Sequence, residues 1–302
     1  MRTDDMAPRR LLEPVTRVAP VSGMLTREEA QALIGRVLKF AKADETQVSV
    51  QGGTQTNVRF ADNRISTAGT ISDTSLVIAS AFGPKHAVVT TNDLTDEGLE
   101  RAVRASEALA KLAPDDPESM PVLGPQQYGE VQAFFDSTGN LTADARAAAA
   151  RAAIEAAKAA GDLTVAGFIQ AGAGAQALGN NKGLFAYFPQ TSVNYTLTVR
   201  TNDGTGSGWG GADHPDWSQI DFKAVSDRAI QKARLSRNPQ AIEPGRYTVI
   251  LEPQAVGDLV QLMGFAIDAR SADEGRSAFS KQGGGNKIGE KIIDERLSVI
   301  SD

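Results

Sequence analysis

Apolar residues recur at helical spacing in four stretches of the chain, and strand-like runs lie between these stretches. The helical spacing predicts helices over 26–42, 95–112, 142–160 and 222–235. The strand-like runs are 47–59, 74–82, 87–91, 163–170, 185–188, 193–201 and 247–251, and a further helix is predicted to begin near Pro253. Because both element types alternate along the chain, the pattern predicts an α+β fold.

Two of the predicted helices carry recognisable end signals. Thr26 and Glu29 have the spacing of a capping box, in which a hydroxyl and a carboxylate satisfy free backbone N–H groups reciprocally. The helix over 142–160 is dominated by alanine, which has the best helix propensity, and Gly161 stands just past its end, where glycine is favoured. These signals place the start of the first helix and the end of the third.

The order helix, strand, polar turn, strand, helix occurs twice along the chain. The two polar turns are Asp62-Asn63-Arg64 and Asn180-Asn181-Lys182. An acid-led helix follows each copy, near Asp96 and near Asp221. The pattern predicts an N-terminal α/β lobe with a duplicated strand-turn-strand-helix unit, followed by the start of a mainly β C-terminal lobe.

Four prolines between Pro114 and Pro125 mark the best linker candidate. The start of the chain mixes arginines with acidic residues and lacks the apolar centre of a secretory signal, and Met24 is an alternative start. We therefore expect a disordered leader over 1–23, an N-terminal α+β domain over 24–125, a central α+β domain over 126–240, and the start of a truncated C-terminal domain over 241–302.

Composition narrows the classes of function. The chain has 302 residues, of which 41% are hydrophobic, and its net charge of −6 argues against a protein that neutralises many phosphates. Cysteine is absent, which excludes disulfides, thiolate nucleophiles and Cys-type zinc sites and fits a reducing cytoplasm. No apolar run reaches the roughly 18 residues that a membrane span needs. We expect a cytoplasmic protein that binds neither nucleic acid nor membrane.

The residues that could carry chemistry are few. The two histidines, His86 and His214, lack the H-E-x-x-H spacing of a zinc site. We interpret His86 as a turn or hairpin residue and His214 as a residue of a solvated loop. The glycine run over 204–211 lacks the Lys-Ser/Thr ending of a phosphate loop and is predicted to be a connection.

Arg59 and Arg64 flank the first polar turn. Such charges usually decorate a solvated face, but arginine also binds carboxylates bidentately. Together with Asn63, these two arginines are the candidate residues for gripping a peptide.

Several segments, taken in order, resemble the TldD/PmbA family, whose members are often labelled modulators of DNA gyrase. These segments are RFADNRI at 59–65, AVRA at 102–105 with EA at 107–108, PGRYTVILEP at 244–253, and DEGRS at 273–277 followed by KIGEK at 287–291. The resemblance covers 26–302, and the order and spacing of the segments make it specific.

The resemblance implies a two-lobed α+β protein whose active relatives are zinc metallopeptidases of short, unstructured peptides. In this family one subunit type carries H-E-x-x-x-H on the helix after the apolar strand, and its partner lacks the motif. Here Pro253 and Asp258 stand in place of the histidines and Gln254 in place of the glutamate base. Proline cannot ligate a metal, and a neutral amide cannot accept a proton from water. We expect a non-catalytic, PmbA-like (TldE-type) subunit without a metal, paired with a zinc-bearing TldD-like subunit in proteolysis.

The resemblance also implies that family members continue well beyond the position of Asp302, so we expect this chain to be truncated. Two other functions stay open. One is an active hydrolase that uses Asp258, Asp268 and His214. The other is a non-enzymatic module that binds a partner protein.

Overall fold

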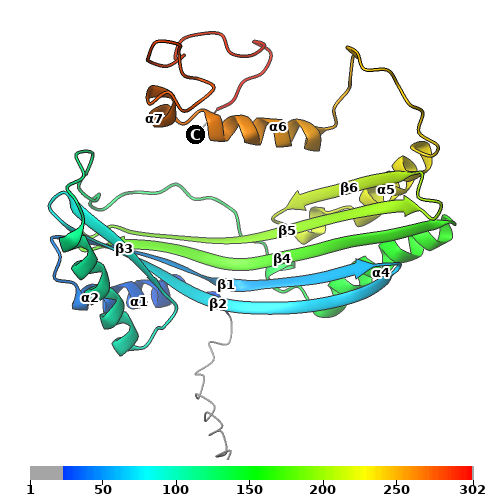
Figure 1. Ribbon diagram of the computed structural model, residues 1–302. Helices are drawn as coiled ribbons and strands as arrows, with labels where there is room; N and C mark the ends of the chain where they lie inside the picture. The colour runs from blue at the N-terminus through cyan, green and yellow to red at the C-terminus, as the bar shows by residue number, and fades with distance from the viewer. Residues whose placement is uncertain (1–22, 301–302) are drawn as a thin grey trace, which may run out of the picture. The chain divides into compact units, whose positions relative to one another are not determined.

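The computed structural model of the chain describes residues 23–300, and the chain divides into two compact units, Met1–Gln240 and Ala241–Asp302 (Figure 1). The leader predicted over 1–23 lies outside the described residues, Gly23 excepted. No helix in the described range combines the length and the apolar content that a membrane crossing needs.

Helices and one large sheet make up the first unit, which confirms the predicted α+β class. The helices are α1 (Arg27–Phe40), α2 (Asp96–Leu112), α3 (Asp136–Gly139), α4 (Ala143–Ala159) and α5 (Phe222–Leu235), with a 3-10 turn at Trp217–Gln219. The strands are β1 (Glu45–Ala61), β2 (Arg64–Phe82), β3 (Lys85–Thr91), β4 (Leu163–Asn180), β5 (Phe185–Thr201) and β6 (Ser207–His214).

The element order repeats, as the sequence predicts. The first half runs α1-β1-β2-β3-α2, and the second half runs α4-β4-β5-β6-α5. The strands form one antiparallel sheet in the order β3-β2-β1-β4-β5-β6, so β1 and β4 join the halves at its centre. Strands from the segments 24–125 and 126–240 therefore lie in a single sheet.

All of the buried apolar positions of β1 lie on one face of the sheet. Val48 and Val50 pack against α1 and α2, whereas Val58 and Phe60 pack in the second core, with α4 and α5. Since residues two apart on a strand share a face, both cores lie on the same side, which leaves the other face of the sheet open. Figure 1 shows α1 and α2 at one end of the long strands and α4 and α5 at the other.

The capping box that begins α1 is confirmed. The backbone N–H of Glu29 donates to the hydroxyl of Thr26 at 3.2 Å, and the N–H of Thr26 donates to the carboxylate of Glu29 at 2.8 Å. The predicted helices over 95–112, 142–160 and 222–235 are also present, with ends within a residue of those predicted.

The glycine run is not a loop, contrary to the prediction, because most of it belongs to β6. A Cβ on Gly208 would lie 2.1 Å from the carbonyl oxygen of Ala229, and one on Gly210 would lie 2.6 Å from that of Val225. Both carbonyls belong to α5. The glycines therefore let this helix approach the strand more closely than any side chain would allow.

The central strands are longer than predicted, and β1 runs through Gly52 and Gly53 without interruption. Gly53 faces Gly174 on β4, and a Cβ on Gly53 would lie 2.7 Å from the carbonyl oxygen of Ala173. Close contact between the two central strands explains glycine in a strand interior here.

The second unit holds two helices, α6 (Pro253–Ala266) and α7 (Ala269–Asp273), and an isolated bridge between Ser280 and Asn286. The strand predicted over 247–251 is not formed within the described residues. Its composition favours a strand, but a strand also needs a neighbouring strand for its backbone hydrogen bonds.

Candidate functional site

The open face of the sheet is rich in side-chain amides and hydroxyls. Alternation along the central strands places Gln51 and Asn57 of β1 opposite Gln176 and Gln170 of β4 on this face. The same face carries further polar residues: Gln47, Ser49, Gln55, Ser75, Gln190, Ser192 and Asn194. A long polar face on an otherwise packed sheet is the first candidate for binding.

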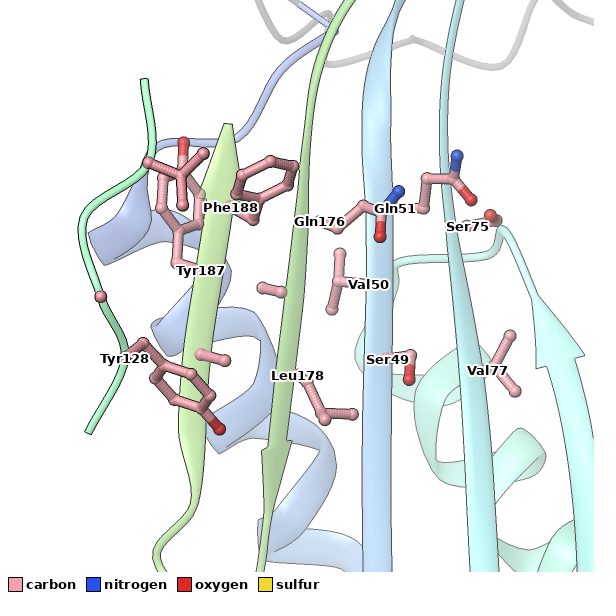
Figure 2. A pocket seen from close by; sticks show the side chains of 14 residues that line it. Ser49, Val50, Gln51, Ser75, Val77, Tyr128, Gln176, Leu178, Tyr187 and Phe188 are labelled. Atoms are coloured by element: carbon pink, nitrogen blue, oxygen red, sulfur yellow. The ribbon is translucent and has the colours of Figure 1, made fainter. Parts of the chain in front are cut away.

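A cavity of about 640 Å³ lies on this face, at the end where α1 and α2 cover the other side (Figure 2). Its polar lining comes from Ser49, Gln51, Ser75 and Gln176. Its large apolar lining comes from Val50, Val77, Tyr128, Val131, Leu178, Tyr187 and Phe188. We call it the aromatic cavity, because Tyr128 and Phe188 form one side of it.

One wall of the aromatic cavity comes from residues 123–135, which we call the strap. The side-chain amide of Asn180 donates to the carbonyl of Leu123 at 2.8 Å. Near the other end, the N–H of Thr191 donates to the carbonyl of Ala133 at 2.9 Å. Figure 2 shows the strap residue Tyr128 on a segment that runs beside β5. The strap is therefore tied at both ends to the second half of the sheet.

A groove of about 410 Å³ continues from the aromatic cavity along the open face and shares Gln51, Ser75 and Gln176 with it. Gln55 and Gln190 extend its amide lining, and glycines form much of its floor. The side-chain amide of glutamine offers a donor and an acceptor together. This arrangement suits a ligand that also alternates donors and acceptors.

Charge is absent from the aromatic cavity. Among the described residues that line it there is no Lys, Arg, Asp, Glu or His, and Asp73 is the one charged residue that lines the adjoining groove. Burial, with the nearby carboxylates of Glu28 and Glu29, raises the pKa of Tyr187, whose hydroxyl donates to the carbonyl of Leu25 at 2.9 Å. The cavity offers neutral hydrogen-bonding groups and apolar surface, which suits binding rather than acid–base chemistry.

The two polar turns hold the sheet together at equivalent positions. The amide of Asn63 donates to the carbonyl of Leu163 at 2.9 Å and accepts from the N–H of Val165 at 2.8 Å. The amide of Asn181 likewise donates to the carbonyl of Asp44 at 3.1 Å and accepts from the N–H of Thr46 at 3.2 Å. Each asparagine thus ties its turn to the first residues of the opposite central strand.

The three candidate peptide-binding residues lie at the opposite end of β1 from the aromatic cavity. The amide of Asn63 is engaged with β4, as described. Arg64 lies 3.9 Å from Asp62, and both side chains are 78% exposed, so this ion pair contributes little. Arg59 is exposed and lines a separate cavity of about 320 Å³ with Phe168 and other residues. A role of these residues in peptide binding stays a prediction.

The helix positions singled out as a degenerate metal site lie on α6. Pro253 is the first residue of the helix, as expected from its fixed φ angle. Gln254 is the second residue of the helix, and its side-chain amide donates to the carboxylate of Asp258, one turn further on, at 2.9 Å. Within the described range, no three His, Cys, Asp or Glu side chains gather as they would around a metal ion.

His86 lies in the hairpin of β2 and β3, as predicted, whereas His214 lies on a strand rather than in a loop, contrary to the prediction. His86 is the second residue of β3, 3.8 Å from Asp116, and His214 ends β6. The Nδ1 atom of His214 accepts a hydrogen bond from the N–H of Asp216 at 3.0 Å and lies 3.2 Å from the carbonyl oxygen of the same residue. The ring is therefore held against the turn that follows β6.

Asp268, the third member of the alternative hydrolase, accepts from the N–H of Ser271 at 2.7 Å and caps α7. Hydrogen bonds from Ser271 hold the pKa of Asp268 below its usual value. Since His214 lies in the first unit and both aspartates in the second, the hydrolase alternative stays a prediction.

Sequence reasoning missed the polar face and the aromatic cavity. A signal existed for the first: polar residues occupy every second position from Gln47 to Gln51 and again from Gln55 to Asn57. The cavity had no such signal, because Tyr128 and Phe188 are distant in sequence and meet only when the strap lies beside β5.

Comparison with known families covers most of the chain. Residues 47–110, 136–237 and 244–302 match, in order, domain 1, the central domain and the C-terminal domain of the PmbA/TldA metallopeptidases. The chain belongs to the PmbA/TldD metallopeptidase family. The resemblance found in the sequence is thereby confirmed. No curated protein sequence matches the chain.

Solved structures of low identity share the fold of this PmbA/TldD chain. TldE from Thermococcus kodakarensis has a TM-score of 0.59 and 19% identity, with 68% of this chain and 47% of that protein covered. A protein described as a DNA gyrase modulator from Thermotoga maritima has a TM-score of 0.71 and 16% identity, with coverage of 81% and 57%.

A similarly described protein from Bacteroides thetaiotaomicron has a TM-score of 0.72 and 15% identity, with coverage of 83% and 60%. The chain therefore spans less than two thirds of each of these proteins.

Proposed function

We propose that this chain is a non-catalytic, PmbA-like (TldE-type) subunit that binds extended peptides on the open face of its sheet. In this proposal a TldD-like partner carries the zinc and cleaves the peptide in the cytoplasm. The observation that carries the proposal is the amide-lined face with its aromatic cavity, whose described lining offers neutral binding groups but no carboxylate or imidazole that could act as a general base.

An extended peptide matches this face because its backbone alternates N–H donors and C=O acceptors. Gln51 faces Gln176 across the two central strands, and Asn57 faces Gln170 farther along. Four amides in two such pairs present donors and acceptors on both sides of a path along the sheet. Since these groups address the main chain, the face suits peptides of many sequences.

The family implies zinc, but the residues of α6 do not fit it. Pro253 has no side-chain atom that could bind a metal, and the amide of Gln254 is hydrogen-bonded to Asp258. The carboxylate of Asp258 is therefore the one metal-binding group among these three positions. Zinc sites in catalytic proteins usually take three protein ligands. The zinc is therefore proposed in the partner, in line with the similarity of this chain to a protein named TldE.

The proposal is tested by measuring zinc and peptide cleavage for the chain alone and with a TldD-like partner. We expect zinc and cleavage only when the partner is present. Stoichiometric zinc together with cleavage by the lone chain would contradict a non-catalytic role.

Peptide binding is measured separately, by calorimetry with an unstructured peptide. The double variant Gln51→Ala, Gln176→Ala should weaken binding about tenfold through the loss of several hydrogen bonds. The matched control is Gln231→Ala, an exposed glutamine on α5, which should leave the affinity unchanged.

A further inference from the structure

The aromatic cavity concentrates large apolar side chains that stay exposed. Tyr128 is 57% exposed and Phe188 is 38% exposed, although both belong to the cavity wall. Val77 and Val131 are also exposed and contribute to the apolar lining. Scattered exposed apolar residues are ordinary, but a group of them around a cavity marks a binding site.

Two cavities along the strap share Tyr128 and Phe188 but differ in the charge of the rest of their lining. The aromatic cavity has no charged lining among the described residues. Another cavity along the strap, of about 720 Å³, includes Arg27 and Glu130. A charged group that entered the aromatic cavity would lose water without gaining an opposite charge, whereas a neutral apolar group would gain contacts.

Position also links the aromatic cavity to the peptide path. Phe188 lies directly across from Gln176 on the neighbouring strand, and Gln176 faces Gln51 in turn. A peptide whose backbone follows the Gln51–Gln176 pair would therefore bring a side chain over Phe188. The volume of about 640 Å³ is within the usual range of about 300–1,000 Å³ for ligand pockets.

From this neutral lining we propose that the aromatic cavity selects extended peptides by one uncharged side chain, aromatic or large aliphatic. The inference rests on the proposed function, because it assigns a preference to the same face. Tyr128 and Phe188 act as specificity-determining residues, and the two glutamines hold the adjoining backbone.

The experiment uses the full chain and five blocked peptides, Gly-Gly-X-Gly-Gly, with X being Phe, Leu, Ala, Asp or Lys. Binding is measured by calorimetry. The peptides with Phe and Leu should bind at least about tenfold more tightly than those with Asp or Lys. Equal affinity for all five would overturn the inference and leave the proposed function standing. No binding of any peptide, by the chain alone or with its partner, would remove both.

Two variants locate the preference. Phe188→Ser and Tyr128→Ser should each lower the affinity for the Phe peptide at least about fivefold and leave the affinity for the Ala peptide unchanged. Tyr247→Ser is the control, because Tyr247 in the second unit is 56% exposed, close to the value for Tyr128. If Phe188→Ser abolishes self-association and leaves peptide affinity unchanged, a second copy of the chain fills the cavity, and the proposal is wrong.

Discussion

At one end of the sheet, α1 and α2 bring large apolar side chains onto the strands, including Leu33, Leu99 and Val103. At the other end, α4 and α5 bring mostly alanine, and the bulk comes from the strands, chiefly Phe60 of β1 and Tyr195 of β5. The same element order therefore supports two ways of filling a core. Helices with small side chains approach their strands closely, which explains why glycines line β6 and not β3.

The largest difference between the two cores should appear in the unfolding free energies of variants with core substitutions. Leu99→Ala empties a fully buried site between α2 and the sheet and should lower the free energy of unfolding by about 2–5 kcal/mol. Ala229→Leu adds bulk where α5 meets β6 and should cost about 1–3 kcal/mol. Urea unfolding measures both.

Leu112→Ala is the control on α2, since that side chain is 83% exposed, and its effect should stay within about 0.5 kcal/mol. If Ala229→Leu stabilises the protein, the close packing inferred for the second half is wrong.

Alkaline pH should act on the second half through Tyr195. Tyr195 of β5 pairs with Ile169 of β4 in the core. In the first half, the comparable buried pair is apolar on both sides, Leu76 of β2 with Val50 of β1. Burial raises the pKa of Tyr195 to about 12, and the hydrogen bond with Ser226 partly offsets the effect. The unfolded chain then loses its proton first, so stability is intact below about pH 10 and falls by up to about 2–3 kcal/mol as pH rises toward 12.

Unfolding of the wild type and of Tyr195→Phe, compared between pH 9 and pH 11.5, isolates this contribution. The variant loses the hydrogen bond to Ser226 at every pH but should show a shallower decline above pH 10. Parallel declines in the two proteins would exclude Tyr195 as the source.

The two asparagine turns offer a closely matched pair. Asn63→Ala and Asn181→Ala each remove two hydrogen bonds to the opposite central strand and should each cost about 1–2 kcal/mol. Asn63 also has a φ of +55°, which favours asparagine or glycine over alanine. Asn63→Ala should therefore cost about 1 kcal/mol more than Asn181→Ala in thermal or urea unfolding.

Asn63→Gly removes the same hydrogen bonds without the backbone strain. It should match Asn181→Ala more closely than Asn63→Ala does. An equal cost for all three variants would mean that the left-handed backbone at this turn contributes nothing measurable.

The smallest effect is expected at the edge of β2. The pairing of β2 with β3 stops at Leu76, so the earlier part of β2 forms an edge of the sheet. In the other half, the strap runs beside the part of β5 that β6 does not pair with. Ile71 is 65% exposed near this edge, so Ile71→Lys should change the free energy of unfolding by less than about 0.5 kcal/mol. The added charge should lower any self-association seen by light scattering.

Local signals predicted most of the helices, because caps and apolar spacing act within a few residues. The hydroxyl of Thr26 and the alanines before Gly161 are examples. The glycine strand β6 could not be predicted, since its glycines are required by the close approach of α5, which lies later in the sequence. The aromatic cavity was hidden for the same reason: Tyr128 and Phe188 come from separate segments. The interpretation of Pro253, Gln254 and Asp258 on α6, in contrast, rests on a family motif and stays a prediction.

The central pairing of β1 with β4 has a kinetic consequence. Thr54 and Ala173 face each other at the middle of the sheet although they lie 119 residues apart in the chain. Each half, in contrast, joins its own two long strands through a short turn. Closing the central contact costs far more chain entropy than forming either hairpin. We therefore expect the two hairpins to form first and the joining of the halves to limit the rate of folding.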